Sequence, residues 1–302
     1  MAEKLAPIVL FAYNRPWHVE QTLQSLRQNV LAKHSVLYCF SDAAKTEADI
    51  ENVKKVRGIL KNTKGFQELH ITEREENWGL ARSIIEGVSE VMKKHQKAIV
   101  IEDDLLFASN FLDFMNDCLN KYQSQTHIFS ISAYLPPIQV ADLQEDVFLL
   151  PRCASWGWAS WLDRWQQADW QVKDFDDFIK NKAERRAFEQ GGNDMTAMLL
   201  KQQKGIIHSW AIRWAYAHFK NKGFAIYPKY TKTKNIGMDG SGTNFDAKNV
   251  TKKYETQIET YPYRLPQNLE WKPNNIFAKR FRKLYNLSYY RKFINYLKFG
   301  IW

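Results

Sequence analysis

Short apolar runs alternate with amphipathic segments along the first hundred residues. The apolar runs are predicted strands and cover residues 7–13, 35–40, 68–72 and 98–101. Between them, residues 17–29, 47–60 and 79–94 carry apolar positions at helical spacing. Strands that alternate with helices of this length are typical of a parallel sheet with crossover helices, so the sequence predicts an α/β fold.

The second half of the chain alternates less clearly and is rich in tryptophan. Its predicted elements are helices over 158–167, 194–203 and 211–221, and a strand over 224–227 that precedes a glycine-rich loop, 235–244. The pattern therefore favours an extension of the same sheet rather than a repeat of the first half.

Three consecutive carboxylates, Glu102, Asp103 and Asp104, directly follow a buried strand. Adjacent acids repel one another, so a cation or a hydrogen-bonding ligand is one reason to find them there. Carboxylate oxygens suit Mg²⁺ or Mn²⁺. The alternative is a solvated loop that caps the next helix.

Polar residues follow all four predicted strands of the first half, at 14–15, 41–42, 73–77 and 102–104. Ligands of open α/β sheets bind outside the carboxyl ends of the strands. These four groups are therefore expected to line one ligand-binding edge.

Several motifs in order resemble those of nucleotide-sugar-dependent glycosyltransferases of the GT-A fold, with N-acetylglucosaminyltransferase I and bacterial relatives near family 2 the most similar. They are residues 10–15, 41–42, 77–82, 102–105, 130–134, 155–160 and 224–230. The resemblance implies a Rossmann-like, mostly parallel sheet flanked by helices. It also implies a GT-A domain over 1–245, with a nucleotide-binding half, 1–128, and an acceptor and donor-sugar half, 129–245.

The resemblance also implies roles for individual residues. Asp104 would bind Mn²⁺ or Mg²⁺, Glu102 and Asp103 would contact the ribose and the donor sugar, and Arg15 and Asp42 would hold the base. A divalent cation on the two phosphates would make the nucleoside diphosphate a better leaving group. Arg15 in a surface salt bridge and Asp42 as a helix cap are the alternatives.

Further donor contacts are expected from Asn77, Arg82 and Trp158. The tryptophans either pack in the core or supply platforms for sugar rings, with Trp156 or Trp158 near the donor. Similarly, the segment 237–242 is interpreted either as a lid over the donor or as a plain surface turn.

The catalytic base is the least defined part of the predicted site. Inverting members of the family deprotonate the acceptor hydroxyl with a carboxylate, but the corresponding stretch, 205–214, contains no acid. His208 and Asp194 are the candidates, with a core histidine and a helix N-cap as the alternatives. Asp163 is a third candidate, unless it pairs with Arg164.

The net charge of +10 is concentrated at one end of the chain. Eight Lys or Arg and no Asp or Glu follow residue 270, which leaves +2 for the first 270 residues. A nucleic-acid-binding protein normally spreads its basic surface over the folded body, so no nucleic-acid partner is expected. The extension 246–302 instead has the composition of a basic amphipathic helix on an anionic membrane surface. A terminal helix docked on the domain is the alternative.

These observations set the expected location and function. No apolar stretch is long enough to span a membrane, no secretion signal is recognised, and the three cysteines fit neither a disulfide framework nor a zinc site. We therefore expect a cytoplasmic protein, peripheral on the inner face of the cell membrane. The expected activity is an inverting hexosyl- or N-acetylhexosaminyltransferase that uses a UDP-sugar and a glycan or lipid-linked acceptor in bacterial surface polysaccharide synthesis. The alternative is a non-catalytic carbohydrate-binding or anionic-membrane-binding protein on the same fold.

Overall fold

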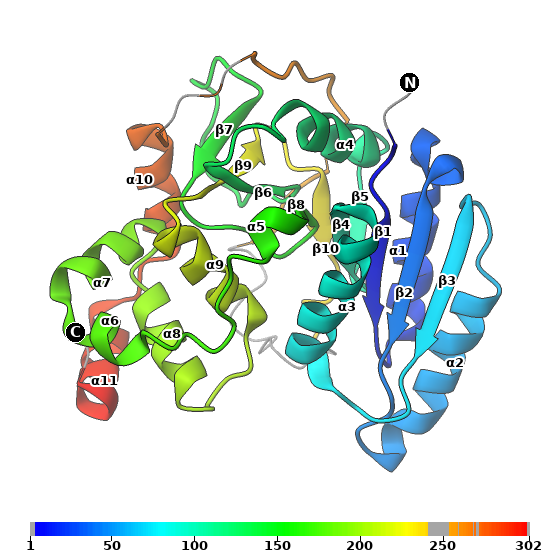
Figure 1. Cartoon of the computed structure of the whole chain (residues 1–302), viewed down its shortest axis with the longest axis horizontal. Coiled ribbons are helices and arrows are strands. Elements are labelled where there is room, and N and C mark those ends of the chain that lie inside the picture. The colour runs from blue at the N-terminus through cyan, green and yellow to red at the C-terminus, as the bar shows by residue number, and fades with distance from the viewer. Residues whose placement is uncertain (1–3, 241–253, 259, 268, 270–271, 301–302) are drawn as a thin grey trace.

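A mixed β-sheet forms the centre of the computed structural model, which describes residues 4–240, 254–258, 260–267, 269 and 272–300 (Figure 1). The strands of the eight-stranded sheet follow the order β3-β2-β1-β4-β8-β6-β9-β7. They are β1 (Ile8–Ala12), β2 (Val36–Ser41), β3 (Glu68–Glu73), β4 (Lys97–Glu102), β6 (Ile128–Ser132), β7 (Val147–Leu150), β8 (Trp158–Trp161) and β9 (Phe224–Pro228). Only β7 and β8 run against the direction of the other strands of this sheet. The predicted α/β fold with a mostly parallel sheet is confirmed.

Helices cover both faces of the sheet because the side chains of its strands alternate between two apolar clusters. In β1, Ile8 and Leu10 belong to one cluster, and Val9 and Phe11 belong to the other. The first cluster packs under α1 (Pro16–Arg27), α2 (Ile50–Lys61) and α4 (Phe111–Lys121), and the second packs under α3 (Gly79–His95) and α9 (Trp210–Lys220). The sheet is therefore the middle of three layers.

The remaining elements are shorter and mostly belong to the second half. The helices are α5 (Leu162–Trp165), α6 (Phe175–Lys180), α7 (Lys182–Phe188), α8 (Met195–Gln203), α10 (Asn275–Leu284) and α11 (Tyr289–Phe299), with 3₁₀ turns at Val30–His34, Glu47–Asp49 and Glu189–Gly191. A second, two-stranded sheet pairs β5 (Leu105–Phe107) antiparallel with β10 (Thr233–Asn235). This small sheet places the segment after β10 beside the acidic segment after β4.

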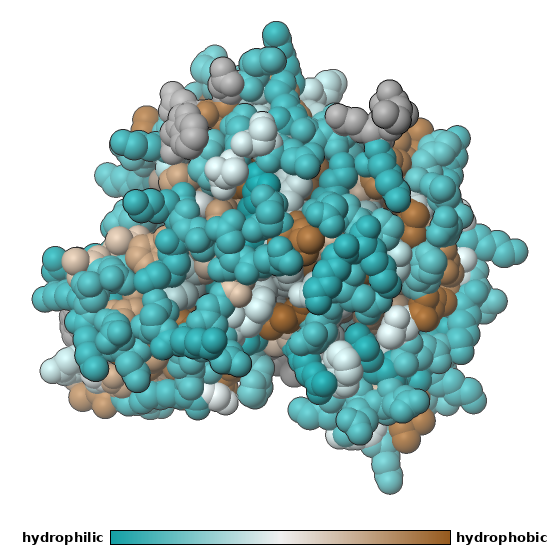
Figure 2. All heavy atoms as spheres, in the orientation of Figure 1, coloured by the Kyte–Doolittle hydropathy of each residue, from teal (hydrophilic) through white to brown (hydrophobic). Residues whose placement is uncertain are grey.

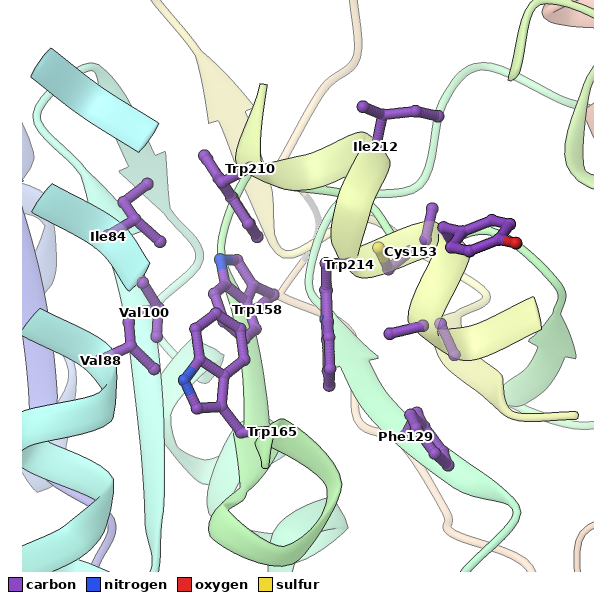
Figure 3. Packing of buried hydrophobic residues seen from close by; sticks show 14 of the residues in the cluster. Ile84, Val88, Val100, Phe129, Cys153, Trp158, Trp165, Trp210, Ile212 and Trp214 are labelled. Carbon is purple, nitrogen blue, oxygen red and sulfur yellow. The ribbon is translucent and has the colours of Figure 1, made fainter. Parts of the chain in front are cut away.

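The predicted helix over 158–167 is wrong in its first part. Residues Trp158–Trp161 form β8, which inserts antiparallel between β4 and β6, and only Leu162–Trp165 is helical. Both faces of β8 are buried, so its four residues carry no period that distinguishes a strand from a helix. Figure 3 shows Trp158 and Trp165 packed between α3 and the Trp214 ring of α9. The tryptophan cluster is mainly core, as one of the two interpretations held.

The two C-terminal helices differ in how they meet the body of the protein. Phe277 and Phe281 of α10 are buried, and they contact Phe148 and Tyr227 of the central sheet. On α11, by contrast, Tyr289 is 83% exposed. The docked-helix interpretation therefore describes α10, whereas α11 keeps an exposed aromatic face. Within the described ranges, no helix has the length and apolar character needed to cross a bilayer.

Candidate active site

A cavity of about 440 Å³ lies at the carboxyl ends of β1, β2 and β4. In Figure 1 these ends point to the lower edge, where the surface in Figure 2 is indented between the two halves of the molecule. The predicted site residues that line the cavity are Arg15, Asp42, Asn77, Glu102, Asp103, Asp104 and His208. The volume is within the range of about 300–1,000 Å³ that small-molecule sites occupy. The structure thus gathers most of the predicted site in one place.

One positive group is held by two carboxylates at this cavity. Nη2 of Arg15 donates to Oδ1 of Asp103 at 2.5 Å and to Oδ2 of Asp104 at 2.9 Å. Burial alone would lower the pKa of Arg15, but the two carboxylate charges outweigh it and raise that pKa. Arg15 therefore forms the ion pair that was its alternative role, but inside the site rather than on the outer surface.

Glu102 has a different environment from its two acidic neighbours. The described residues offer its carboxylate no hydrogen bond within 3.5 Å and no ion pair. Burial, followed by the charges of Asp104 and Asp103, raises the pKa of Glu102 to about 8. Its side chain is therefore an unpartnered polar group in the cavity wall, and such groups are common in ligand sites.

Asp42 caps the helix that follows the third strand. Its two carboxylate oxygens accept hydrogen bonds from the backbone N–H groups of Trp78 at 2.9 Å and Gly79 at 2.8 Å, at the start of α3. The helix-cap alternative for Asp42 is therefore what the structure shows. Asn77 contributes to the same junction, because its Nδ2 donates to the carbonyl of Ala43 at 2.7 Å.

Two predicted donor contacts lie outside the cavity wall. Arg82 stacks on the ring of Trp78 on the surface, 4.0 Å from the ring centroid, and is not among the lining residues. Trp158 is 1% exposed and stacks on Trp165 in the core. The expected contact of Trp158 with the donor is corrected by this placement, and Trp156 lines the cavity instead.

The three candidate bases have different positions. His208 lines the cavity, whereas Asp194 pairs with Arg152 at 2.7 Å and Asp163 pairs with Arg164 at 2.6 Å. Neither of these two acids lines the cavity. Asp194 also occupies the N-cap position of α8 without a side-chain capping bond.

The segment after β10 closes against the acidic residues, a contact that the sequence did not reveal. The backbone N–H of Ile236 donates to the carbonyl of Asp104 at 2.8 Å, and a Cβ on Gly237 would collide with Oδ2 of Asp104. The glycine-rich composition of this segment was visible in the sequence. The acidic segment that it packs against was not. The rest of the loop predicted as a lid extends past residue 240 and lies outside the described residues.

The acidic segment fits a divalent cation that shares its coordination with a substrate. In the described part of the chain, no group of three or more His, Cys, Asp or Glu is arranged to hold a metal. Asp103 and Asp104 nevertheless converge on one cationic nitrogen, and one or two carboxylates are what Mg²⁺ uses when substrate phosphates complete its coordination. The donor set is therefore suited to a metal that arrives with a phosphorylated ligand.

No family model matches the chain, and no curated protein matches it. Among solved structures, it is similar to a mannosyltransferase from Pyrobaculum calidifontis in complex with GDP-Man and Mn²⁺ (12% identity, 72% of this chain and 74% of that chain, TM-score 0.42). It is also similar to the galactosyltransferase LgtC (11%, 73% and 72%, 0.40) and to a UDP-glucose pyrophosphorylase (10%, 76% and 92%, 0.39).

Two of these matched structures are sugar transferases and the third is a sugar-nucleotide pyrophosphorylase. At such low identity and partial overlap, they do not define the activity of this chain.

Proposed function

We propose that this chain is a metal-dependent glycosyltransferase that moves a sugar from a nucleoside-diphosphate donor to a saccharide acceptor. The observation that carries the proposal is the pair Asp103 and Asp104, which hold a single cationic group at the wall of a 440 Å³ cavity. An acidic pair in this position is suited to a cation and its diphosphate, because a diphosphate alone would be repelled.

Each residue of the site would have a defined task when the donor binds. Asp104 and Asp103 would hold Mn²⁺ or Mg²⁺, which stabilises the charge that develops on the leaving diphosphate. Arg15 would be released from the carboxylates as the cation arrives, and its guanidinium would then be available to the donor. Glu102, which has no hydrogen-bond partner among the described residues, would accept hydrogen bonds from sugar hydroxyl groups.

The proposed base is His208. It lines the donor cavity and also a second cavity beside it, so a hydroxyl group of an acceptor in the second cavity would lie between His208 and the donor. Among the described residues, no carboxylate forms a hydrogen bond or an ion pair with His208, so the imidazole would act without an orienting acid. Inversion at the transferred carbon is the expected stereochemistry, with UDP as the expected nucleotide.

The proposed contact with the membrane is made by α11 alone. This helix carries Arg291, Lys292 and Lys298 and no acidic residue, and its Tyr290 and Leu297 are 73% and 67% exposed. Basic residues beside exposed aromatic rings favour the interface of an anionic bilayer. A lipid-linked acceptor in bacterial surface polysaccharide synthesis would suit an enzyme held there.

The decisive experiment is nucleotide-sugar turnover with and without Mn²⁺, measured as release of the nucleoside diphosphate. Asp104→Asn is expected to lower the turnover at least about 1,000-fold, because the metal supplies several kcal/mol of charge stabilisation. Asp117→Asn is the matched control, since Asp117 lies on α4 away from the cavity.

Full activity in Asp104→Asn would remove the metal from the proposal. A wild-type protein that binds neither the nucleotide nor Mn²⁺ would favour the alternative, a carbohydrate- or membrane-binding protein without catalysis.

A further inference from the structure

A second cavity, also about 440 Å³, adjoins the proposed donor cavity. Five residues line both cavities, and they are Leu80, Glu102, Trp156, Ile207 and His208. The two cavities therefore adjoin one another and share these side chains as a common wall. A molecule in the second cavity would meet a molecule in the first at Glu102 and His208.

Five tyrosine or tryptophan side chains line the second cavity, and they are Tyr134, Trp156, Trp210, Tyr254 and Tyr285. The Tyr134 and Trp156 rings lie 4.4 Å apart between centroids, and Tyr254 lies 6.1 Å from both Trp156 and Tyr285. Charged side chains are few, and Arg152 is already paired with Asp194. Aromatic faces with a few polar groups suit the C–H faces of a sugar ring better than they suit a polyphosphate.

The C-terminal segment supplies part of this wall. Tyr254 and Tyr285 both line the cavity, although they lie beyond the glycine-rich loop in the sequence. The hydroxyl group of Tyr134 donates to the carbonyl of Tyr254 at 3.0 Å. Tyr285 lies directly after α10, and the Arg152 guanidinium stacks on its ring at 4.1 Å.

The turn before α8 lets this segment approach closely. Gly192 has a φ of +140°, and a Cβ at this position would meet the Cβ of Tyr285 at 2.9 Å and Nη1 of Arg152 at 2.9 Å. The next residue, Asn193, accepts a hydrogen bond from the backbone N–H of Leu287 at 2.6 Å. The end of α10 thus packs against a surface formed by Arg152, Asp194 and Gly192.

We propose that the C-terminal segment, through Tyr254 and Tyr285, completes an aromatic chamber that binds the saccharide acceptor. The assignment rests on the proposed glycosyltransferase function, since it names the substrate class of the neighbouring cavity. It gives α10 a role in acceptor binding that is separate from the membrane contact of α11. The pair Arg152 and Asp194 is then a positioning element for Tyr285 rather than a catalytic one.

Saturation-transfer difference NMR with a panel of methyl α- and β-hexosides, in the presence of UDP and Mn²⁺, tests the chamber directly. Tyr285→Ala and Trp156→Ala are expected to weaken glycoside binding about three- to tenfold, because each removes one stacking face. For Tyr285→Ala, UDP binding measured by calorimetry should stay within about twofold of the wild type, because Tyr285 lines the second cavity and not the donor cavity.

Two further variants keep the test independent of folding. Tyr285→Phe retains the ring and should bind the glycosides about as well as the wild type. Tyr261→Ala removes a tyrosine from the same extension, 54% exposed and outside both cavities, and should also be unchanged.

The outcomes separate this proposal from the proposed function. Equal glycoside binding by the wild type, Tyr285→Ala and Trp156→Ala would overturn the chamber, as would a wild type that binds UDP but none of the glycosides. Glycoside binding that is lost in the variants while UDP fails to bind would instead leave the chamber standing and overturn the donor site.

Discussion

The first half of the chain and its tryptophan-rich second half build the same site by different means. In the first half, Arg15, Asp42 and the three acids follow buried strands, so the sheet itself brings them to one edge. In the second half, loops contribute Trp156 and His208, the first two turns of α9 contribute further lining residues, and the distant C-terminal segment contributes Tyr254 and Tyr285. In the first half, the ends of the strands therefore set the positions of the site residues. In the second half, those positions depend on how loops, helices and the C-terminal segment pack together.

The largest effect should come from His208, which the second half adds to the wall of the proposed donor cavity. His208→Ala is expected to lower sugar transfer by about 10²–10⁴, the usual contribution of a general base. Nucleotide affinity should change little. Comparing kcat for transfer with the calorimetric affinity for UDP checks both statements.

His34→Ala removes an exposed histidine far from the cavities and serves as the control. A loss of about 10²–10⁴ in Asp194→Asn, together with unchanged transfer in His208→Ala, would reassign the base to Asp194. The base would then be the acid that pairs with Arg152, rather than the histidine in the loop before α9.

The sequence was sufficient to locate a site residue wherever that residue follows a strand with a clear hydrophobic pattern. The order β1, β2 and β4 and the position of ligands at strand ends were enough to gather Arg15, Asp42 and Asp104. The side-chain partners of these residues were not predictable, because the pairing of Arg15 with two carboxylates and the capping of α3 by Asp42 are contacts over long sequence distances. The strand β8 was missed since an element buried on both faces has no polar side to reveal its period.

The second prediction concerns the division of the tryptophans between core and cavity. Trp158→Ala should lower the free energy of unfolding by about 3–5 kcal/mol, because it empties a fully buried site between α3 and α9 (Figure 3). Trp156→Ala should cost clearly less, since its ring lies in a cavity wall. Urea unfolding of both variants measures the difference, and equal losses would show that the two tryptophans share one role.

The third prediction uses a buried polar group of the second half. Burial lowers the pKa of His218 to about 4 from the ordinary value of 6.5, against a hydrogen bond to the Trp214 carbonyl that raises it. The folded state therefore keeps His218 neutral, while the unfolded state takes up a proton below pH 6.5. Its contribution to stability is complete above that pH and is lost as the pH falls toward 4.

Between pH 7 and pH 5 the wild type should lose about 2 kcal/mol of unfolding free energy through this group. His218→Gln keeps an amide that can bond to Ser130 but has no titrating ring. The pH dependence of the variant should be weaker by that amount in urea unfolding. An identical pH dependence in both proteins would assign the acid sensitivity to other groups.

The smallest effect concerns the surface of α11, where the second half meets its proposed partner. Arg291→Ala should weaken binding to anionic lipid vesicles about fivefold, since each basic residue at such a surface contributes about 1 kcal/mol. Lys54→Ala removes the same charge from exposed α2 in the first half and should leave vesicle binding unchanged. Co-sedimentation with vesicles of anionic and of zwitterionic lipid measures both variants. Equal losses from the two variants would mean that the net charge of the whole chain, rather than α11, attracts the membrane, and the two halves would then not differ in this respect.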